Sequence, residues 1–417
     1  MKNYKLRNCL IRALILLPLF IMNIAAADYS VKGIVLDKET GKAVPGASIR
    51  IEGTNKGTYS SSGGKFKLPF IQGNIILNIN SIGYESSKIK INENNRDTLV
   101  IRLNPSSVRL EGIEKTAAIE PEEIIKRAIS RKQENLSKLK TFKGLLYSKL
   151  VFEMNGAPFS NASKDGNNIV INAAVGDKKE NDKFQYFILE SFSDVMKDYD
   201  KKITRSYIKQ RKQTANISPN NNVMSITDFV NFYDENINFI NTEMITPLNK
   251  DALSYYNFRI IEKTILGDRY VYILEVKPKT ELIPLFEGTI KIVEGTYNLV
   301  ELDLKTSKQT AIAFIRDVSL TQKFTEAEKD IWHPSMLEVK GKANVEAVKG
   351  LIDIEMDLTA TSIYNELQVN IPLPDSIYGT NLKSTTTVEK TADSAKKEFW
   401  EQNSMREISD REKEFYS

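Results

Sequence analysis

The sequence predicts a mainly β protein, in which a small β-sandwich precedes a longer antiparallel β-meander that carries a few helices. Three observations support this fold class. Short runs in which apolar and polar residues alternate recur along the chain, and this is the period of strands with one buried face. Clusters of Gly, Asn, Asp and Ser separate the runs and predict turns. The clearest stretch with a helical period is residues 120–139.

The first region, residues 28–104, is expected to form the sandwich. Its turn segments are residues 37–41, 53–57, 62–64 and 92–95. Several short strands at this spacing favour two packed sheets with a common core. The apolar residues that alternate along the expected strands are Ala47, Ile49 and Ile51; Phe66, Leu68 and Phe70; Ile75, Leu77 and Ile79; Ile89 and Ile91; and Leu99, Ile101 and Leu103.

Ordered motifs in this region carry a family resemblance. They are Gly33-Ile34-Val35-Leu36-Asp37, Thr40-Gly41, Val44-Pro45-Gly46-Ala47-Ser48-Ile49, Gly53-Thr54, Gly57-Thr58, Gly64-Lys65-Phe66 and Ser81-Ile82-Gly83-Tyr84. The region resembles the carboxypeptidase-regulatory-like domain, which implies a transthyretin-like or Ig-like β-sandwich without catalytic residues. The family often has Thr-Asp before the Gly-x-Phe turn, whereas this chain has Ser60-Ser61-Ser62. We therefore expect the turn to be held differently here.

A linker is expected at residues 105–119, and a helix then opens a β-rich module at residues 120–375. Pro121 suits the first turn of a helix, and Glu122 and Glu123 suit the positive end of its dipole. The apolar stripe of this helix consists of Ile125, Ala128, Ile129, Leu136 and Leu139.

The module is expected to be an antiparallel meander, because successive strands are joined by hairpin turns. The turns are Gly267-Asp268 and Glu294-Gly295-Thr296. A second helix is expected at Thr227–Ile240, where Phe229, Val230, Tyr233, Ile237 and Ile240 would share one face. The expected strands lie at residues 184–189, 258–266, 269–276, 289–293, 299–304, 312–320, 337–345 and 351–362.

The same module carries a second resemblance, on Ile245-Thr246-Pro247-Leu248, Ala252-Leu253-Ser254-Tyr255-Tyr256-Asn257-Phe258 and Leu285-Phe286-Glu287-Gly288-Thr289-Ile290-Lys291-Ile292. Residues from about 120 to 417 resemble the periplasmic region of an outer-membrane family of undetermined function. In that family a C-terminal membrane β-barrel follows, and no such barrel is expected in this chain. The meander is also similar in outline to the half-open barrels of periplasmic lipoprotein carriers, an analogy of fold that assigns no function.

Residues 376–417 are expected to form a polar linker and short C-terminal helices. Ser384–Thr387 is interpreted as a polar loop, and a helix is expected around Lys396–Glu401. Ser409-Asp410-Arg411-Glu412 has the pattern of a capping box, which starts a helix. The resemblance and this unfinished helix predict that the chain is the periplasmic part of a longer protein. A frayed natural terminus is the alternative.

Residues 1–27 have the pattern of a cleavable signal peptide. Lys2, Lys5, Arg7 and Arg12 form a positive region that precedes an apolar run over residues 13–22, and Ala25-Ala26-Ala27 supplies a cleavage site. The run is shorter than the roughly 20 apolar residues of a membrane-spanning helix. An uncleaved N-terminal anchor is the alternative. We expect export, to the periplasm or the periplasmic face of the outer membrane.

Cleavage would leave a neutral chain without thiols. Four of the 58 basic residues lie before residue 28, where there are no acids, so 54 basic and 54 acidic residues remain. No basic block stands out, which argues against nucleic acid as a partner. The single cysteine, Cys9, also lies in the signal segment, so we expect no disulfides.

Catalytic, cofactor-binding and metal-binding residues are expected to be absent. The chain has one histidine, His333, whereas a zinc carboxypeptidase site usually needs two His and a carboxylate. A lone histidine without an oriented partner favours a structural role. Asp194, Asp198 and Asp200, near Tyr199, lack the glycine of a calcium loop and are interpreted as a solvated loop.

We therefore expect a non-enzymatic envelope protein that serves as the docking part of an outer-membrane system, with an outer-membrane or periplasmic protein as its partner. A first alternative is a periplasmic carrier for an apolar or lipid ligand. It predicts a concave sheet lined by Ile290, Ile292, Leu302 and Leu304, with space between them. A second alternative, a hydrolase, requires a pocket in which titratable groups converge.

Overall fold

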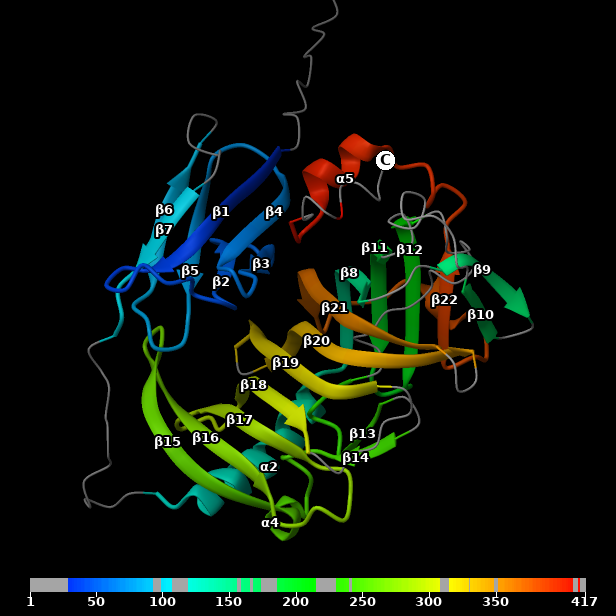
Figure 1. Cartoon of the computed structure of the whole chain (residues 1–417). Coiled ribbons are helices and arrows are strands. Elements are labelled where there is room, and N and C mark those ends of the chain that lie inside the picture. The colour runs from blue at the N-terminus through cyan, green and yellow to red at the C-terminus, as the bar shows by residue number, and fades with distance from the viewer. Residues whose placement is uncertain are drawn as a thin grey trace, which may run out of the picture.

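Seven strands at the N-terminus form a β-sandwich, as the alternating pattern predicts (Figure 1). The computed structural model describes residues 29–92, 99–106, 119–155, 159–165, 168–173, 186–214, 230–239, 242–307, 315–329, 331–348, 352–407 and 412. One sheet has the order β4-β1-β7, with β1 and β7 parallel, and the other has the order β3-β2-β5-β6. The strands are β1 (Tyr29–Asp37), β2 (Ser48–Ile51), β3 (Gly57–Tyr59), β4 (Lys65–Ile71), β5 (Ile75–Asn80), β6 (Ser87–Ile91) and β7 (Leu99–Leu103).

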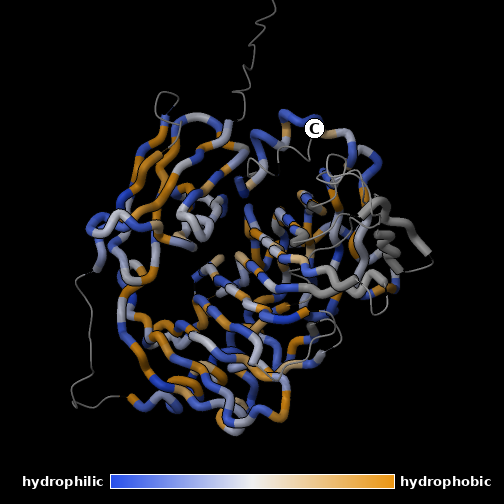
Figure 2. The backbone as a smooth tube through the Cα atoms, viewed as in Figure 1, coloured by the Kyte–Doolittle hydropathy of each residue, from blue (hydrophilic) through white to orange (hydrophobic). Residues whose placement is uncertain are grey.

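The alternating apolar residues fill the space between these two sheets. Ile49, Phe66, Leu68, Leu77 and Ile79 are almost fully buried in one apolar cluster. Hydrophobic and hydrophilic residues alternate along several of these strands, as the colours in Figure 2 show. The sandwich therefore has a core of its own.

An eleven-stranded sheet makes up most of the remaining chain. Its order is β15-β16-β17-β18-β19-β20-β21-β8-β11-β12-β22, and all neighbours are antiparallel except β12 and β22. Seven consecutive strands, β15 to β21, form the predicted meander, and the earlier strand β8 joins it beside β21. The strands are β8 (Thr141–Asn155), β11 (Tyr186–Asp198), β12 (Ile203–Gln213), β15 (Tyr256–Leu266), β16 (Arg269–Pro278), β17 (Phe286–Val293), β18 (Leu299–Thr306), β19 (Ile315–Glu328), β20 (Ile331–Val348), β21 (Ile352–Val369) and β22 (Ser384–Val388).

The predicted helix is α2 (Pro121–Lys138), and the large sheet curves around it. Helix α2 contacts both β15 and β20, which are five strands apart in the sheet, so the sheet must be concave on this side. Ile124, Ile125 and Ala128 are buried against the apolar residues of the concave face. The buried Lys132 donates hydrogen bonds to Glu235 Oε1 (2.6 Å) and to the Leu248 carbonyl (2.7 Å).

Smaller elements complete the fold. Helices α4 (Ala252–Tyr255) and α5 (Lys397–Asn403) and the 3-10 helix η4 (Asp375–Tyr378) are short. Two hairpins are formed by β9 (Phe159–Asp165) with β10 (Asn168–Ala173), and by β13 (Asn236–Phe239) with β14 (Thr242–Ile245). No helix in the part of the chain that the structure describes is both long and apolar enough to span a membrane.

The helix predicted at Thr227–Ile240 is wrong in its described part. Residues 230–235 form turns, and strand β13 follows. The carbonyl groups of Asp234 and Glu235 accept hydrogen bonds from Thr246 Oγ1 (2.8 and 3.1 Å), and not from donors one helical turn ahead. The helical spacing of Val230, Tyr233 and Ile237 reflects burial in the core and not a helix.

The loop predicted at Ser384–Thr387 is also wrong, because these residues belong to strand β22. They pair in parallel with Thr204 to Ile208 of β12, at the edge of the large sheet. The run of β-branched threonines suits an edge strand with one face in solvent. The expected capping box at residues 409–412 lies outside the described residues except for Glu412, which forms an ion pair with Lys149 (2.9 Å).

Candidate functional site

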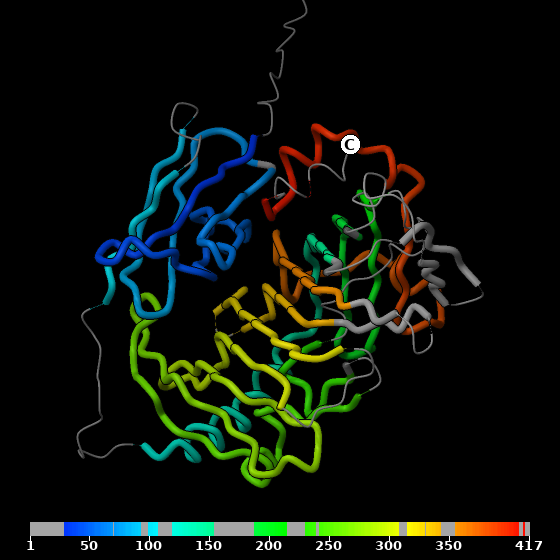
Figure 3. Tube along the Cα trace, in the orientation of Figure 1, coloured from blue at the N-terminus to red at the C-terminus, as the bar shows by residue number. Residues whose placement is uncertain are grey.

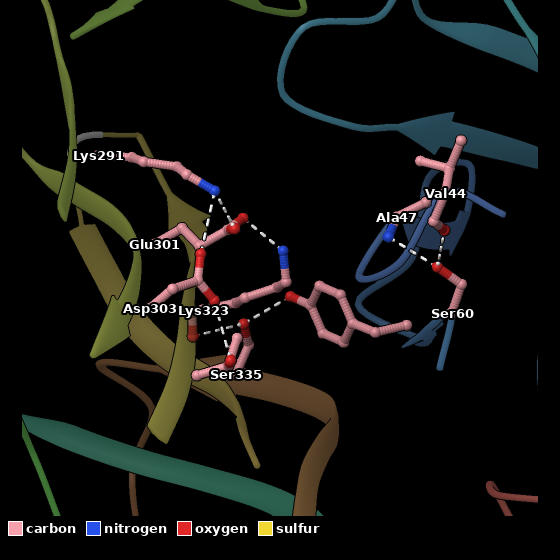
Figure 4. Close-up of polar contacts among 10 residues, drawn as sticks. Val44, Ala47, Ser60, Lys291, Glu301, Asp303, Lys323 and Ser335 are labelled. Atoms are coloured by element: carbon pink, nitrogen blue, oxygen red, sulfur yellow. Dashed lines mark hydrogen bonds and ion pairs between the residues drawn. The ribbon is translucent and has the colours of Figure 1, made fainter. Parts of the chain in front are cut away.

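The sandwich contacts the outer face of the large sheet. The local sequence patterns do not predict this contact. The tip of strand β3 reaches the sheet, where Tyr59 OH hydrogen-bonds to Ser335 Oγ at 2.5 Å (Figure 4). Ser335 Oγ also donates to the Lys323 carbonyl at 3.2 Å, so the tyrosine is tied to both β19 and β20. We call the contact surface formed by β3, β18–β21 and the C-terminal segment 389–407 the junction.

Ser60 holds the turn that presents Tyr59. Its Oγ accepts a hydrogen bond from the Ala47 backbone N–H (2.8 Å) and donates to the Val44 carbonyl (2.7 Å) (Figure 4). This buried serine follows β3 directly, in the stretch where the chain departs from the regulatory-like pattern. The expectation that this region is held differently is consistent with these two bonds, which fix the start of the turn through a hydroxyl group.

A chain of charges lies under the sandwich on the outer face of the sheet. Glu301 on β18 forms ion pairs with Lys291 on β17 and Lys323 on β19 (Figure 4). Lys291 also contacts Asp303 at 3.2 Å, and Thr321 Oγ1 donates to Asp303 at 2.9 Å. Burial alone would raise the pKa of Glu301, but the ammonium groups of Lys323 and Lys291 lower that pKa to about 2.

Gly46 brings the sandwich against this charge chain. Its φ of +65° is in the left-handed region, and a Cβ at this position would lie 2.4 Å from Lys323 Cε. Any larger residue would therefore push against the lysine that neutralises Glu301. The glycine allows the close approach of the two regions.

Side chains from the large sheet and the C-terminal segment cover the free edge of β3. Asn365 Oδ1 accepts a hydrogen bond from the Gly57 backbone N–H at 2.9 Å. Arg406 Nη1 donates to the Tyr59 carbonyl at 2.6 Å. The flanking lysines are paired too, Lys56 with Glu366 (2.9 Å) and Lys65 with Glu407 (2.8 Å).

The sandwich also contacts the opposite edge of the meander. The Gly83 backbone N–H donates to the Ile265 carbonyl of β15 at 2.9 Å. Since Asn365 lies on β21, the sandwich contacts the sheet at strands that are six positions apart in its order. Contacts this widely spaced restrict rotation of the sandwich about either one.

The C-terminal segment packs between the sandwich and strands β8 and β11, as the red trace in Figure 3 shows. Trp400 is buried and stacks on Phe192 of β11, with ring centroids 5.9 Å apart. Ser404 and Tyr147 both donate to the fully buried Glu190. Lys67 of β4 donates to the Glu401 carbonyl, and burial lowers the pKa of this lysine to about 8.

The histidine, His333 on β20, lies beside a cavity of about 70 Å³. His333 Nε2 lies 3.0 Å from Tyr199 OH, Nδ1 lies 2.6 Å from the Pro334 carbonyl, and the ring stacks on Phe142. Burial, together with the charge of Lys197, lowers the pKa of His333 to about 3. The ring is therefore neutral at pH 7, with Nδ1–H as donor to the carbonyl, which suits the structural role predicted for it.

The expectation that Asp194, Asp198 and Asp200 belong to a solvated loop is wrong for Asp198. Asp198 is buried and not solvated, because Tyr378 OH donates to Oδ2 and the Lys201 backbone N–H donates to Oδ1, both at 2.8 Å. The concave sheet exists, but its lining is packed without the space that a carrier would need. Ile290, Ile292, Leu302 and Leu304 are each at most 2% exposed, within the core that α2 covers.

Across the described residues, no group of three His, Cys, Asp or Glu side chains gathers where a metal ion could be held.

The fold and the junction define a two-part β protein, in which a regulatory-like sandwich is docked on a curved antiparallel sheet. Residues 31–114 match the model of the CarboxypepD_reg-like domain. Residues 124–361, more than half of the chain, match the model described as "Family of unknown function (DUF5686)". The chain belongs to this family, and the resemblances expected from the motifs are confirmed.

One curated relative is similar over part of the chain. TonB-dependent receptor P3 of Formosa agariphila is 26% identical over 106 residues, which is 25% of this chain and 10% of the receptor. The chain thus matches about a tenth of the length of that relative.

Three solved structures are similar over 62–63% of this chain and 98–99% of their own. They are a putative outer membrane lipoprotein-sorting protein domain from Vibrio parahaemolyticus (8% identity, TM-score 0.24), a DUF1329 family protein from Desulfovibrio piger (12%, 0.22) and a LolA superfamily protein from Nitrosomonas europaea (10%, 0.21). Scores this low do not establish a common fold.

Proposed function

We propose that this chain is a non-enzymatic envelope protein whose sandwich and curved sheet act as one docking unit on the periplasmic face of an outer-membrane system. We assign the sandwich to residues 28–104 and the β-rich module to residues 120–375. The observation that carries the proposal is the contact between the two regions at separate points, at Tyr59 and Arg406 in the junction and at Gly83 on the opposite edge of the meander. A fixed composite surface is what recognition of a protein partner requires, because little ordering entropy is then lost on binding.

The state of the titratable groups supports a role other than catalysis. Glu301 is neutralised by two lysines, and Glu190 accepts bonds from two hydroxyl groups. His333 has a pKa of about 3, so it is a poor general base at neutral pH. The cavity beside it, at about 70 Å³, is far smaller than the roughly 300–1,000 Å³ of common ligand sites.

The pattern of the first residues and one relative support the proposed location. Residues 1–27 have the pattern of an export signal. Residues 31–114 match the CarboxypepD_reg-like domain, and the curated relative bears the name of a TonB-dependent receptor. We therefore place the chain at the periplasmic face of the outer membrane.

Site-specific photo-cross-linking in intact cells tests this proposal. A benzophenone amino acid would replace Leu282, Leu382 or Val100, which are exposed apolar residues in three parts of the molecule, with the exposed Lys42 as control position. We expect the cross-linker at one or more of the apolar positions to form a 1:1 adduct with a single envelope protein, and the cross-linker at Lys42 to form no such adduct. Recovery of the same abundant proteins at all four positions would contradict a docking role.

A carrier of apolar ligands is the second candidate, and one observation favours it. Helix α2 lies across the concave face, and the 70 Å³ cavity is lined by Leu136 and Leu139 at its C-terminal end and by Trp332. A lipid could enter only if α2 moved away from the sheet. Native mass spectrometry of the purified chain tests this, because a carrier predicts a co-purified lipid and a docking unit predicts the bare protein mass.

A further inference from the structure

Among the described residues, side chains cap the peptide groups of Gly57 and Tyr59 at the outer edge of strand β3. In its sheet, of order β3-β2-β5-β6, strand β3 is the outermost strand. The Lys56 carbonyl accepts a hydrogen bond from the Ile51 N–H, and the Ser60 N–H donates to the Ala47 carbonyl. The peptide groups of Lys56 and Ser60 therefore face β2. The alternation along a strand then turns Gly57 and Tyr59 to the other side. Each of these two residues meets one cap, Asn365 or Arg406.

Covering of this kind is how folded proteins protect an edge strand from pairing with another chain. Here the caps come from elements far away in the sequence, the end of β21 and the C-terminal segment. The edge therefore stays covered while these two caps are in place. When the caps move away, the Gly57 N–H and the Tyr59 carbonyl become free on the same side of one strand.

The charges around the caps indicate what the edge would accept. Lys56 and Lys65 are neutralised by Glu366 and Glu407, which lie beside the caps. Because Glu366 and Glu407 directly follow the two caps in the chain, release of the caps takes both acids away from the two lysines. An incoming segment would restore the balance if it carried carboxylates at these places.

Arg406 gives an independent indication of an acidic ligand. This arginine is only 9% exposed, yet its Nε and Nη2 atoms have no hydrogen-bond acceptor among the described residues. A buried guanidinium with one edge unfilled is costly. Nε and Nη2 form the side of the guanidinium that binds a carboxylate through two parallel hydrogen bonds.

We propose that the β3 edge is a masked strand-addition site, which pairs with an extended acidic segment of a partner protein when Asn365 and Arg406 release it. The backbone of the segment replaces the two caps, and one of its carboxylates fills the Nε/Nη2 side of Arg406. This inference rests on the proposed docking role and names the kind of partner that the docking unit receives.

Fluorescence anisotropy with two labelled peptides tests the site. In one short peptide Thr and Glu alternate, and in the other Gln replaces Glu. We expect wild type to bind the Glu peptide more tightly than the Gln peptide. Asn365→Ala should strengthen binding of the Glu peptide by roughly fivefold, the factor that corresponds to one neutral hydrogen bond. Arg406→Ala should reduce the preference for Glu over Gln, and Lys56 and Lys65 should account for what remains of it.

The control is the pair of substitutions Asn104→Ala and Arg316→Ala, which removes exposed hydrogen bonds or ion pairs away from β3 and should change neither result. Amide hydrogen exchange shows whether the cap has been removed, because the Gly57 N–H should exchange faster in Asn365→Ala. If Gly57 exchanges faster but the affinity stays the same, or if wild type binds both peptides equally, the inference is wrong.

A tether tests the same site without loss of a cap. The Glu366 N–H donates to the Asn55 carbonyl at 3.1 Å, so Asn55→Cys and Glu366→Cys would place two thiols close together in a chain without other cysteines after residue 27. The oxidised form should lose peptide binding, and reduction should restore it. Equal binding in both forms would overturn the inference. The docking role itself would survive that result if photo-cross-linking still captured a partner.

Discussion

The inner and outer faces of the large sheet are covered by different parts of the molecule, as strand β18 shows. On the inner face of β18, Leu302 and Leu304 pack in the apolar core beneath α2. On the outer face, Glu301 is almost equally buried, at 9% exposure, but its neighbours are two ammonium groups and the sandwich lies beyond them. The comparison shows that a polar face of an alternating strand is not always a solvent face. In this chain part of it is an internal interface between two β regions.

Removing Glu301 should give the largest effect on this comparison. Glu301→Ala leaves Lys291 and Lys323 partly buried without their shared acid, and we expect a loss of about 3–5 kcal/mol in the free energy of unfolding. Leu302→Ala on the inner face should cost about 2–5 kcal/mol through loss of packing. Urea denaturation measures both.

A triple substitution tests whether the ion pairs of Glu301 stabilise the chain beyond what burial of apolar side chains at the same positions would give. Replacing Lys291 and Lys323 with Met and Glu301 with Leu should be nearly neutral for stability, since an apolar trio avoids the cost of desolvating charges. A loss as large as that of Glu301→Ala would show that the ions stabilise the junction beyond their mutual neutralisation.

Acid should lower the stability first through His333 and, below about pH 4.5, through Glu301 as well. His333 has a pKa of about 3 in the folded chain against 6.5 ordinarily, so the unfolded state binds the proton first as the pH falls below 6.5. The stability that the neutral histidine contributes is present above pH 6.5 and is lost towards pH 3, by up to about 1.4 kcal/mol per pH unit.

Between pH 6.5 and 5 this predicts a loss of about 2 kcal/mol in wild type, and His333→Gln should abolish that slope because the chain has no other histidine. Tyr199→Phe keeps the imidazole and should keep the slope. Glu301, with its lowered pKa, contributes stability above pH 4.5 that is lost between about pH 4.5 and 2. Unfolding curves measured at each pH check both windows, and an unchanged slope in His333→Gln would contradict the assignment.

Two glycines test the contact between the sandwich and the charge chain. Gly46 and Gly53 both have a left-handed φ, but only a Cβ on Gly46 would meet other atoms, those of Lys323. Substitution by Ala should cost about 1–2 kcal/mol at either position through backbone strain. Gly46→Ala should cost more than Gly53→Ala, by an amount that thermal unfolding reports; equal costs would mean that Lys323 moves aside without consequence.

Among the single substitutions, the smallest effect is expected for removal of the Tyr59 hydroxyl group. Tyr59→Phe removes its hydrogen bond to Ser335 while Ser335 keeps its bond to the Lys323 carbonyl. The expected cost is about 1 kcal/mol. Tyr378→Phe, which loses a hydroxyl bond to Asp198 away from the junction, is the matched control.

The sequence predicted the elements whose signals are local. Alternation located the strands from Ala47 to Leu103 and those of the meander, and Pro121 with its two following acids marked the start of α2. The errors came where long-range contacts overrode the local pattern. Thr246 donates hydrogen bonds to two carbonyl groups, those of Asp234 and Glu235, that a helix at Thr227–Ile240 would use within itself. Residues Ser384–Thr387 form a strand because they pair with the edge of β12.

The junction could not be predicted in the same way. Gly57 and Asn365 are 308 residues apart in the chain, and neither lies in a motif that names the other. Ser60 was the nearest local sign, because it stands where the regulatory-like pattern is interrupted. Glu301 and Lys323 have the ordinary pattern of solvent-facing strand residues, and only the position of the sandwich shows that they are covered.

The central claim is that the sandwich and the curved sheet form one unit, and a distance measurement in solution tests it most directly. Spin labels on Lys42→Cys in the sandwich and Lys305→Cys on β18 would be the only labels in the chain after residue 27. Pulsed electron paramagnetic resonance should give one narrow distribution of distances between them. A broad distribution, as for two regions joined only by a linker, would contradict the account.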